Sequence, residues 1–362
     1  QYSPQTPGVY AEPVLIMPAW IMKYYILDLS PRNSLVRYLV EKGHTVFMIS
    51  WKNPDAADRE LSLADYVKLG FLDALAEVRR IVPQQPVHAV GYCIGGTLLS
   101  IAAALLAAKG DASLASLTLL AAQVDFSEPG ELSVFITPSQ IAMLEAVMSK
   151  NGVLESERMG AAFAMLRSRE LMWTPAVNQY MRGERPQLND LMAWNADGTR
   201  MPWRMHSEYL ERLYLNNELA RGTFTLDGVQ VDLKRIRLPM FVVGTETDHV
   251  APWRSAYKVR NLTRSADYTF LLTSGGHNAG IVSGPVHPRR RHRLLTWKNA
   301  TATLTPDEWL KSTTPHEGSW WPAWETWLAQ HSAARQKPAR APAARGSRGT
   351  ALLDAPGSYV RS

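Results

Sequence analysis

The sequence contains almost no cysteine, because Cys93 is the only one among 362 residues. A lone thiol cannot form a disulfide within the chain, and it excludes the paired cysteines of structural zinc and iron–sulfur sites. This usage agrees with a reducing compartment. The sequence therefore predicts a cytoplasmic protein that holds no metal ion.

Several other patterns are missing as well. There is no run of about 18 or more apolar residues that could span a membrane, and no charged-then-apolar export signal at the start. The chain also lacks the glycine-lysine loop that binds nucleotide phosphates and the glycine fingerprint that binds dinucleotides. We therefore expect no transmembrane segment, no export, no bound cofactor, and neither nucleotide hydrolysis nor hydride transfer.

Most of the chain carries almost no net charge. The formal net charge is +6, but segment 331–362 alone holds six basic residues against one acidic residue. The rest is nearly neutral, so we expect no nucleic-acid partner. Segment 331–362 is rich in Ala, Arg and Pro, which predicts a disordered basic tail. The basic run 289–293 could attract a phosphorylated substrate such as coenzyme A, but we favour a solvated loop.

The sequence does contain an alternation of short apolar runs and amphipathic segments, which predict strands and helices in turn. Strands are expected at 13–18, 45–51, 87–92, 117–121, 238–244 and 268–272, and helices at 34–41, 63–78, 97–108, 255–262 and 320–327. The last helix carries four tryptophans at helical spacing, interpreted as a packing stripe. This alternation predicts a parallel sheet with helices on both faces.

The strand pattern is interrupted between about 125 and 222, where the sequence becomes helical and holds nine of the thirteen methionines. We interpret this segment as a helical cap inserted into the sheet order. Its methionines could simply pack its own core, or they could line an apolar tunnel or lid. The predicted organisation is 1–124 as the first half of the core, 125–222 as the cap, 223–330 as the second half, and 331–362 as the tail.

Cys93 lies where a strand should turn sharply into a helix, in Gly91-Tyr92-Cys93-Ile94-Gly95-Gly96. Gly-x-Cys-x-Gly at such a turn is typical of the nucleophile elbow of an α/β-hydrolase fold, with cysteine in place of serine. Sulfur at this position favours chemistry on thioesters, because attack exchanges one carbon–sulfur bond for another. Taken alone, a buried cysteine is more often an apolar filler.

Two ionisable residues complete the nucleophile–acid–histidine order of this fold. Asp248 follows the strand at 238–244, and His277 follows the strand at 268–272. We expect Cys93 to attack, His277 to move the proton and Asp248 to orient His277. His249 is interpreted as auxiliary.

The negative oxygen that forms during attack also needs donors. By the logic of the fold, the backbone N–H of Ile94 supplies one, and the loop after the first strand, near Trp20 or Ile21, supplies a second.

At this level of detail the chain resembles the class I, short-chain polyhydroxyalkanoate synthases, over about residues 2–330. The resemblance rests on Pro18-Ala19-Trp20-Ile21, on 43–54, on the elbow, on Trp194-Asn195-Ala196-Asp197, on 248–253, on Ser274-Gly275-Gly276-His277 and on Ser319-Trp320-Trp321-Pro322. It implies an acyltransferase that polymerises (R)-3-hydroxyacyl coenzyme A, the 3-hydroxybutyryl thioester in this class, through a covalent cysteine intermediate with release of coenzyme A.

The resemblance also implies partners for this chain, and the chain differs from the family at three positions. A homodimer that carries a growing polyester chain at a granule surface is implied. The family usually has Pro where Ala19 stands, Asn where Met22 stands and Ile where Asn278 stands. In the family the aspartate may activate the incoming hydroxyl instead of orienting the histidine, so both roles stay open for Asp248.

Two other interpretations stay open. The triad alone is equally compatible with a cysteine-dependent hydrolase, of the thioesterase or dienelactone-hydrolase type. A non-catalytic scaffold that keeps the fold is the third possibility.

Overall fold

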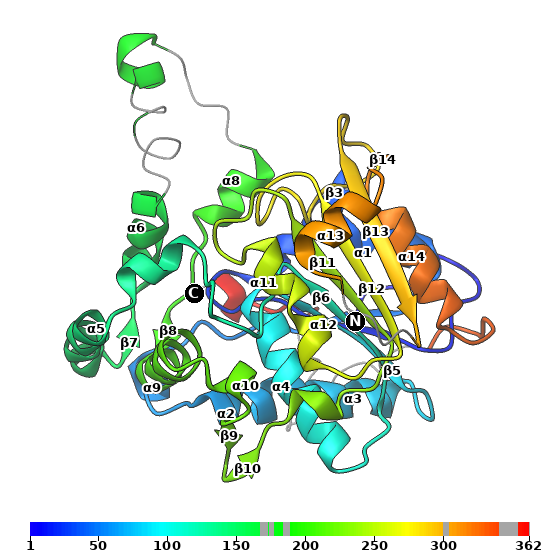
Figure 1. Cartoon of the computed structure of the whole chain (residues 1–362), viewed down its shortest axis with the longest axis horizontal. Helices are drawn as coiled ribbons and strands as arrows, with labels where there is room; N and C mark the ends of the chain where they lie inside the picture. Colours follow the sequence, from blue (N-terminus) through cyan, green and yellow to red (C-terminus); the bar gives the residue numbers. More distant parts are fainter. Residues whose placement is uncertain (167–172, 174–176, 184–188, 300–303, 340–353, 362) are drawn as a thin grey trace.

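The computed structural model describes residues 1–166, 173, 177–183, 189–299, 304–339 and 354–361. Its centre is an eight-stranded sheet in the order β14-β13-β12-β11-β6-β5-β1-β4 (Figure 1). The six strands from β12 to β4 are parallel, and β13 and β14 run antiparallel at one edge. The strands are β1 Val14–Met17, β4 Val46–Met48, β5 Val87–Tyr92, β6 Leu114–Leu120, β11 Met240–Thr245, β12 Asp267–Thr273, β13 Arg291–Lys298 and β14 His316–Glu317.

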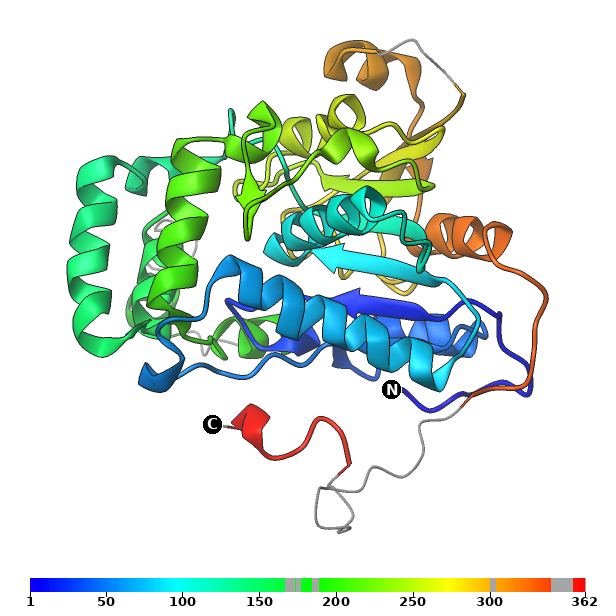
Figure 2. The same cartoon turned by 90° about the horizontal axis from the view of Figure 1, so that it is seen from below.

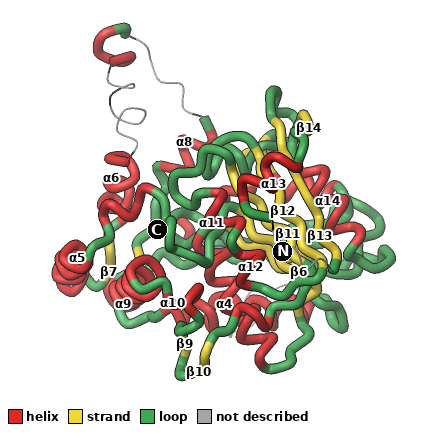
Figure 3. The backbone as a smooth tube through the Cα atoms, viewed as in Figure 1, coloured by secondary structure: helices red, strands yellow, loops and turns green. Residues whose placement is uncertain are grey.

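Helices cover both faces of this sheet, as the alternation predicts. Figure 1 shows α3 and α4 on one face and α1 and α14 on the other, and Figure 3 shows the strands as a yellow layer between the red helices. The core helices are η1 Tyr24–Leu27, α1 Leu35–Glu41, η2 Ala56–Asp58, α2 Leu63–Asp65, η3 Tyr66–Leu72, α3 Asp73–Ile81, α4 Ile94–Ala108, η8 Leu233–Arg235, α11 Trp253–Tyr257, α12 Val259–Leu262, α13 Pro306–Ser312 and α14 Trp321–Gln330.

The central strands and α4 are apolar because both sides of the sheet are covered. Every residue of β5 and β11 is buried, which explains why these strands read as continuous apolar runs. Helix α4 is buried along most of its length and therefore shows little amphipathic character. The predicted mostly parallel sheet with helices on both faces is confirmed.

The helix expected over 63–78 forms as three consecutive pieces, α2, η3 and α3. The middle piece is a π-helix. It contains Gly70, and a Cβ at that position would collide with the Trp51 ring. The missing side chain at Gly70 therefore lets this helix pass close to the loop after β4, a contact that apolar spacing does not report.

Between β6 and β11 the chain leaves the sheet and forms a group of helices beside it, which we call the cap. Figure 2 shows this group, coloured green, stacked at one end of the sheet. Its elements are η4 Glu131–Phe135, α5 Pro138–Asn151, β7 Val153–Leu154, α6 Ser156–Leu166, η6 Val177–Met181, α8 Asp190–Asn195, β8 Met201–Pro202, α9 Trp203–Glu208, η7 Tyr209–Leu215 and α10 Glu218–Arg221.

The structure adds short strands that the sequence did not predict. Strands β7 and β8 pair antiparallel inside the cap, and two further pairs join β2 Asp28–Ser30 to β3 Asn33–Ser34 and β9 Thr225–Leu226 to β10 Val229–Gln230. A strand of two or three residues is too short to show an alternating pattern.

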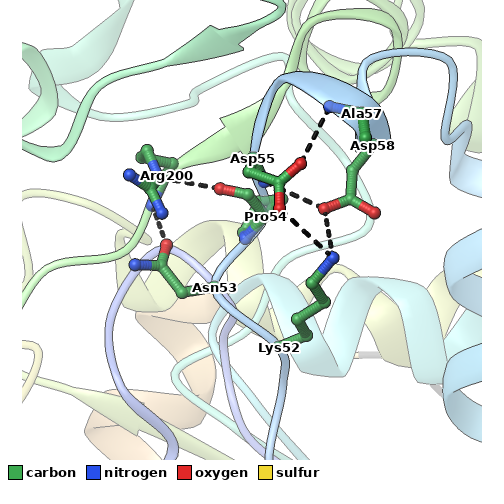
Figure 4. Close-up of polar contacts among 7 residues, drawn as sticks. All are labelled: Lys52, Asn53, Pro54, Asp55, Ala57, Asp58 and Arg200. Carbon is green, nitrogen blue, oxygen red and sulfur yellow. Dashed lines mark hydrogen bonds and ion pairs between the residues drawn. The ribbon is translucent and has the colours of Figure 1, made fainter. Parts of the chain in front are cut away.

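One cap residue, Arg200, ties the cap to the core. Its backbone N–H donates to Asn53 Oδ1 at 2.9 Å, and its Nε donates to the Pro54 carbonyl at 2.7 Å (Figure 4). The loop that receives it is itself held by Lys52, whose Nζ lies 2.7 Å from Asp58 and 3.7 Å from Asp55. These contacts fix one side of the cap on the loop after β4.

The methionines of the cap do not share one environment. Met148 and Met205 are fully buried, whereas Met143 and Met181 are mostly exposed. Met172 lies outside the described residues. The cap methionines therefore include both packing residues and surface residues.

The basic run at 289–293 is the expected solvated loop only at Arg289 and Arg290. From Arg291 onward it forms the start of β13, which pairs antiparallel with β12 from His292 to Lys298. Arg291 forms an ion pair with Glu246 at 3.0 Å, and Arg293 donates to the Thr313 carbonyl. The apolar pattern did not predict this strand, because β13 is buried at only a few positions and carries charged side chains at others.

Part of the tail also differs from the prediction of disorder. Gln336 forms a two-way backbone bridge with Val9, and the backbone N–H of Ala333 donates to Glu12. The Arg335 guanidinium stacks 4.7 Å from the centre of the Tyr10 ring. Residues 331–339 are therefore ordered along the amino-terminal segment, a contact between chain ends that composition does not reveal. Residues 340–353 and 362 lie outside the described residues.

Candidate active site

The turn at Cys93 has the backbone geometry of a nucleophile elbow. Cys93 follows β5 directly and caps α4 with φ 54° and ψ −129°, a conformation that side chains rarely adopt. A Cβ on Gly91 would meet Gly96, and a Cβ on Gly95 would meet the Met17 carbonyl. The glycines therefore let strand and helix approach closely enough to hold Cys93 at the tip, where it is partly exposed.

His277 and Asp248 come together from two separate loops, after β12 and β11. His277 Nδ1 lies 2.8 Å from Asp248 Oδ2, so the ring N–H donates to the carboxylate. Asp248 is also fixed by three other donors, the Thr245 hydroxyl at 2.9 Å and the backbone N–H groups of Val250 at 2.9 Å and Ala251 at 2.8 Å. The Asp248 side chain is fully buried.

The charges around His277 favour its protonated form. Burial lowers the pKa of His277, but the negative charges of Asp248 and Cys93 and hydrogen bonds to both raise it well above its usual value. Burial raises the pKa of Asp248, while the His277 charge and the hydrogen bonds from His277, Ala251 and Val250 bring it below its usual value. The arrangement thus favours an imidazolium beside the Asp248 carboxylate.

A cavity of about 120 Å³ opens at Cys93. Core residues Cys93, Ile94 and Ile21 line one side of it, and the cap supplies most of the rest, mainly with apolar side chains. Two cap methionines, Met159 and Met201, are among them. His277 and Asp248 do not line this cavity themselves. The thiol therefore faces an apolar chamber roofed by the cap.

The predicted oxyanion residues divide into two groups. Ile94 is the first residue of α4, so its N–H has no acceptor within that helix, and both Ile94 and Ile21 line the cavity beside Cys93. Trp20 does not line the cavity, and its ring packs against Trp51 and Tyr66. Ile94 and Ile21 are therefore the better placed candidates.

His249, expected to be auxiliary, is half-buried and does not line the cavity. Its carbonyl accepts the backbone N–H of Glu131 at 2.9 Å. This contact joins the Asp248 loop to the first helical turn of the cap.

Two tryptophans of the packing stripe hold the loop that carries His277. Trp320 and Trp321 are buried and donate their indole N–H groups to the carbonyls of Gly280 at 3.0 Å and Ile281 at 2.9 Å. The interpretation of these tryptophans as packing residues is confirmed, since all four are buried.

Asn278, where the resembled family usually has Ile, joins three parts of the structure. It accepts a hydrogen bond from the buried hydroxyl of Tyr92, the residue before Cys93. Its amide donates to Asn195 of the cap at 3.5 Å. Asn278 in place of Ile therefore connects β5, the His277 loop and the cap through polar contacts.

Sequence reasoning missed several polar residues of the cavity wall. Gln123, His206, Tyr209 and Tyr214 all line the cavity. Three of them lie in the cap and one follows β6, so no spacing in the sequence connects them. The Nδ1 atom of His206 is buried without a hydrogen-bond partner among the described residues.

Among the described residues, no cluster of His, Cys, Asp and Glu has the arrangement of a metal site. A model of the alpha/beta hydrolase fold family matches residues 12–283. The chain belongs to the α/β-hydrolase fold family. This agrees with the elbow, the loop positions of Asp248 and His277, and the sheet order described above. No helix among the described residues is long and apolar enough to cross a membrane.

Within this fold family, the whole chain aligns with curated polymerases. It is 41% identical to the poly(3-hydroxyalkanoate) polymerase of Methylorubrum extorquens and covers 58% of that protein. It is 39% identical to the poly(3-hydroxyalkanoate) polymerase subunit PhaC of Cupriavidus necator, of which it covers 61%, and 39% identical to that of Rhizobium meliloti, of which it covers 58%. This α/β-hydrolase is thus a homologue of these polymerases, and it spans about three fifths of their length.

Proposed function

We propose that this chain is the catalytic region of a poly(3-hydroxyalkanoate) polymerase that uses 3-hydroxyacyl coenzyme A thioesters. The observation that carries the proposal is the Cys93 elbow beside the Asp248–His277 pair, at a cavity roofed by the cap. Similarity to the polymerases over the whole chain supports it. Short-chain substrates, a homodimer and a cytoplasmic granule surface belong to the same proposal.

The first half-reaction transfers the acyl group to the enzyme. Cys93 gives its proton to His277, the thiolate attacks the thioester carbonyl, and the N–H groups of Ile94 and Ile21 stabilise the oxyanion. Collapse of the intermediate breaks the bond to coenzyme A, whose sulfur takes the proton from His277. One thioester replaces another, so the energy of the bond is retained in acyl-Cys93.

In the second half-reaction a hydroxyl group of a second hydroxyacyl unit attacks acyl-Cys93. His277 takes the hydroxyl proton, the new ester bond forms, and the Cys93 sulfur leaves. We assign Asp248 to orienting His277, because four donors already occupy its buried carboxylate and leave it poorly placed to accept a proton from a hydroxyl. The apolar cap would keep out water, which competes with the hydroxyl.

The test is incubation of the protein with 3-hydroxybutyryl coenzyme A, with free coenzyme A and insoluble polyester both measured. We expect coenzyme A release together with polymer. Cys93→Ala should abolish release while the fold, monitored by circular dichroism, is kept. His277→Gln should slow acylation of Cys93. Free 3-hydroxybutyrate without polymer would identify a hydrolase instead, and unchanged turnover in Cys93→Ala would exclude the covalent mechanism.

A further inference from the structure

Two side chains in the cavity wall have buried polar atoms without a partner among the described residues. They are Nδ1 of His206 and Oε1 of Gln123. His206 is 2% exposed and Gln123 is 4% exposed, yet both line the cavity that contains Cys93. Buried polar atoms are almost always hydrogen-bonded in folded proteins. Their position at a cavity indicates that a bound molecule supplies the missing partner.

His206 is a neutral hydrogen-bonding group in this setting. Burial lowers its pKa to about 4, so at neutral pH one ring nitrogen donates and the other accepts. It lies in α9 of the cap, whereas Gln123 lies on the core segment after β6. The Thr97 hydroxyl fixes that segment by donating to the Gln123 carbonyl at 2.7 Å. The two unpartnered atoms thus come from opposite sides of the seam between cap and core.

Two tyrosines extend the same polar wall. The Tyr209 hydroxyl donates to the Tyr214 hydroxyl at 3.4 Å, and both tyrosines line the same cavity as Gln123. Burial first, and then charges that include Cys93, raise the pKa of both tyrosines, so both hydroxyls stay protonated. Cys93 lines the same cavity as these polar groups. The rest of the cavity lining is mostly apolar.

We infer that His206 and Gln123, supported by Tyr209 and Tyr214, bind the hydroxyl group of the hydroxyacyl substrate and so position it relative to Cys93. A hydroxyl both donates and accepts, which matches a neutral imidazole and an amide oxygen. An acyl chain without a hydroxyl would leave these atoms unpartnered. The inference rests on the proposed function, and it assigns the selection of hydroxyacyl over plain acyl thioesters to this wall.

The experiment compares 3-hydroxybutyryl coenzyme A with butyryl coenzyme A in single-turnover acylation, with enzyme in excess and free coenzyme A quantified after acid quench. The unaltered protein should acylate at least about tenfold faster with the hydroxylated thioester. His206→Leu should reduce that rate about tenfold or more and leave the butyryl rate nearly unchanged, because only the hydroxylated substrate loses a partner. The ratio of the two rates should then approach one.

Trp203→Phe is the matched control. Trp203 also lies in α9 and also has a buried, unpartnered N–H, but it does not line the cavity. This variant should keep both rates. If His206→Leu fails to fold, Gln123→Met provides the same comparison from the core side, since it keeps the length of the side chain and removes its polar atoms.

The outcomes separate the inference from the proposed function. Equal loss of both rates in the wall variants, or no preference for the hydroxylated thioester in the unaltered protein, would overturn the inference alone. Release of coenzyme A from neither thioester by the unaltered protein would overturn the proposed function and the inference with it.

Discussion

At the scale of single residues, the site depends on charges that stabilise one another. The His277 ring is hydrogen-bonded to Asp248, whose buried carboxylate is held by four donors in all. Such a carboxylate both fixes the orientation of the ring and favours its charged form. In the proposed mechanism the contribution of Asp248 therefore acts through His277.

Replacing Asp248 by Asn tests this role. The amide has the size of the carboxylate but no charge, so the pKa of His277 should fall and less thiolate should form at neutral pH. We expect Cys93 to react more slowly with iodoacetamide, and acylation to drop by a factor on the order of 10² or more. The measurement is the pH profile of alkylation. A profile identical to that of the unaltered protein would contradict the assignment.

At the scale of elements, the His277 loop depends on a helix that does not line the cavity. Helix α14 and the residue before it hold the His277 loop through the indole N–H groups of Trp320 and Trp321. Trp324 on the same helix instead donates to the Thr118 hydroxyl of β6 at 3.0 Å. One helix therefore supports both the loop and the sheet, with different tryptophans.

This division predicts different effects for two similar substitutions. Trp320→Phe leaves the Gly280 carbonyl without its donor, and should lower the free energy of unfolding by about 1–3 kcal/mol and also slow acylation by loosening the His277 loop. Trp324→Phe should cost similar stability, measured by urea denaturation, while acylation keeps its rate. Equal rate losses in both variants would show that packing alone, and not the bond to the loop, is responsible.

At the scale of the whole molecule, buried neutral histidines make the fold sensitive to acid. Burial, with the neighbouring His44 and His331, lowers the pKa of His88 to about 3, and burial lowers that of His206 to about 4. Both are near 6.5 when unfolded. Between these values the unfolded chain binds more protons than the folded protein.

The free energy of unfolding should therefore decrease as the pH falls from about 6.5 towards 4. Below that range the lowered pKa of Asp248 adds a further loss near pH 4. His277 acts in the opposite direction, because its raised pKa contributes stability that is lost as the pH rises through its folded value. Urea denaturation across this pH range measures the slope, and His206→Leu should make it shallower. A slope unchanged by that substitution would contradict the assignment of His206 as a buried neutral group.

The sequence alone predicted the alternation of strands and helices, the inserted cap, the elbow at Cys93, and Asp248 and His277 as its partners. These features are carried by local patterns, namely apolar periodicity, glycines at a sharp turn and the chain order of strand ends. The structure confirms the sheet and brings Asp248 and His277 within hydrogen-bond distance. The roles of Cys93, His277 and Asp248 in the reaction stay predictions.

Only the tertiary structure decided which distant residues meet. The arginines of β13 pair within the sheet and the ordered tail lies along the amino-terminal segment, although their composition predicted a loop and disorder. His206 and Gln123 are 83 positions apart in the sequence and share one cavity wall. Burial and the lack of a partner are properties of three-dimensional packing, so no pattern along the chain could have distinguished these two side chains from ordinary surface residues.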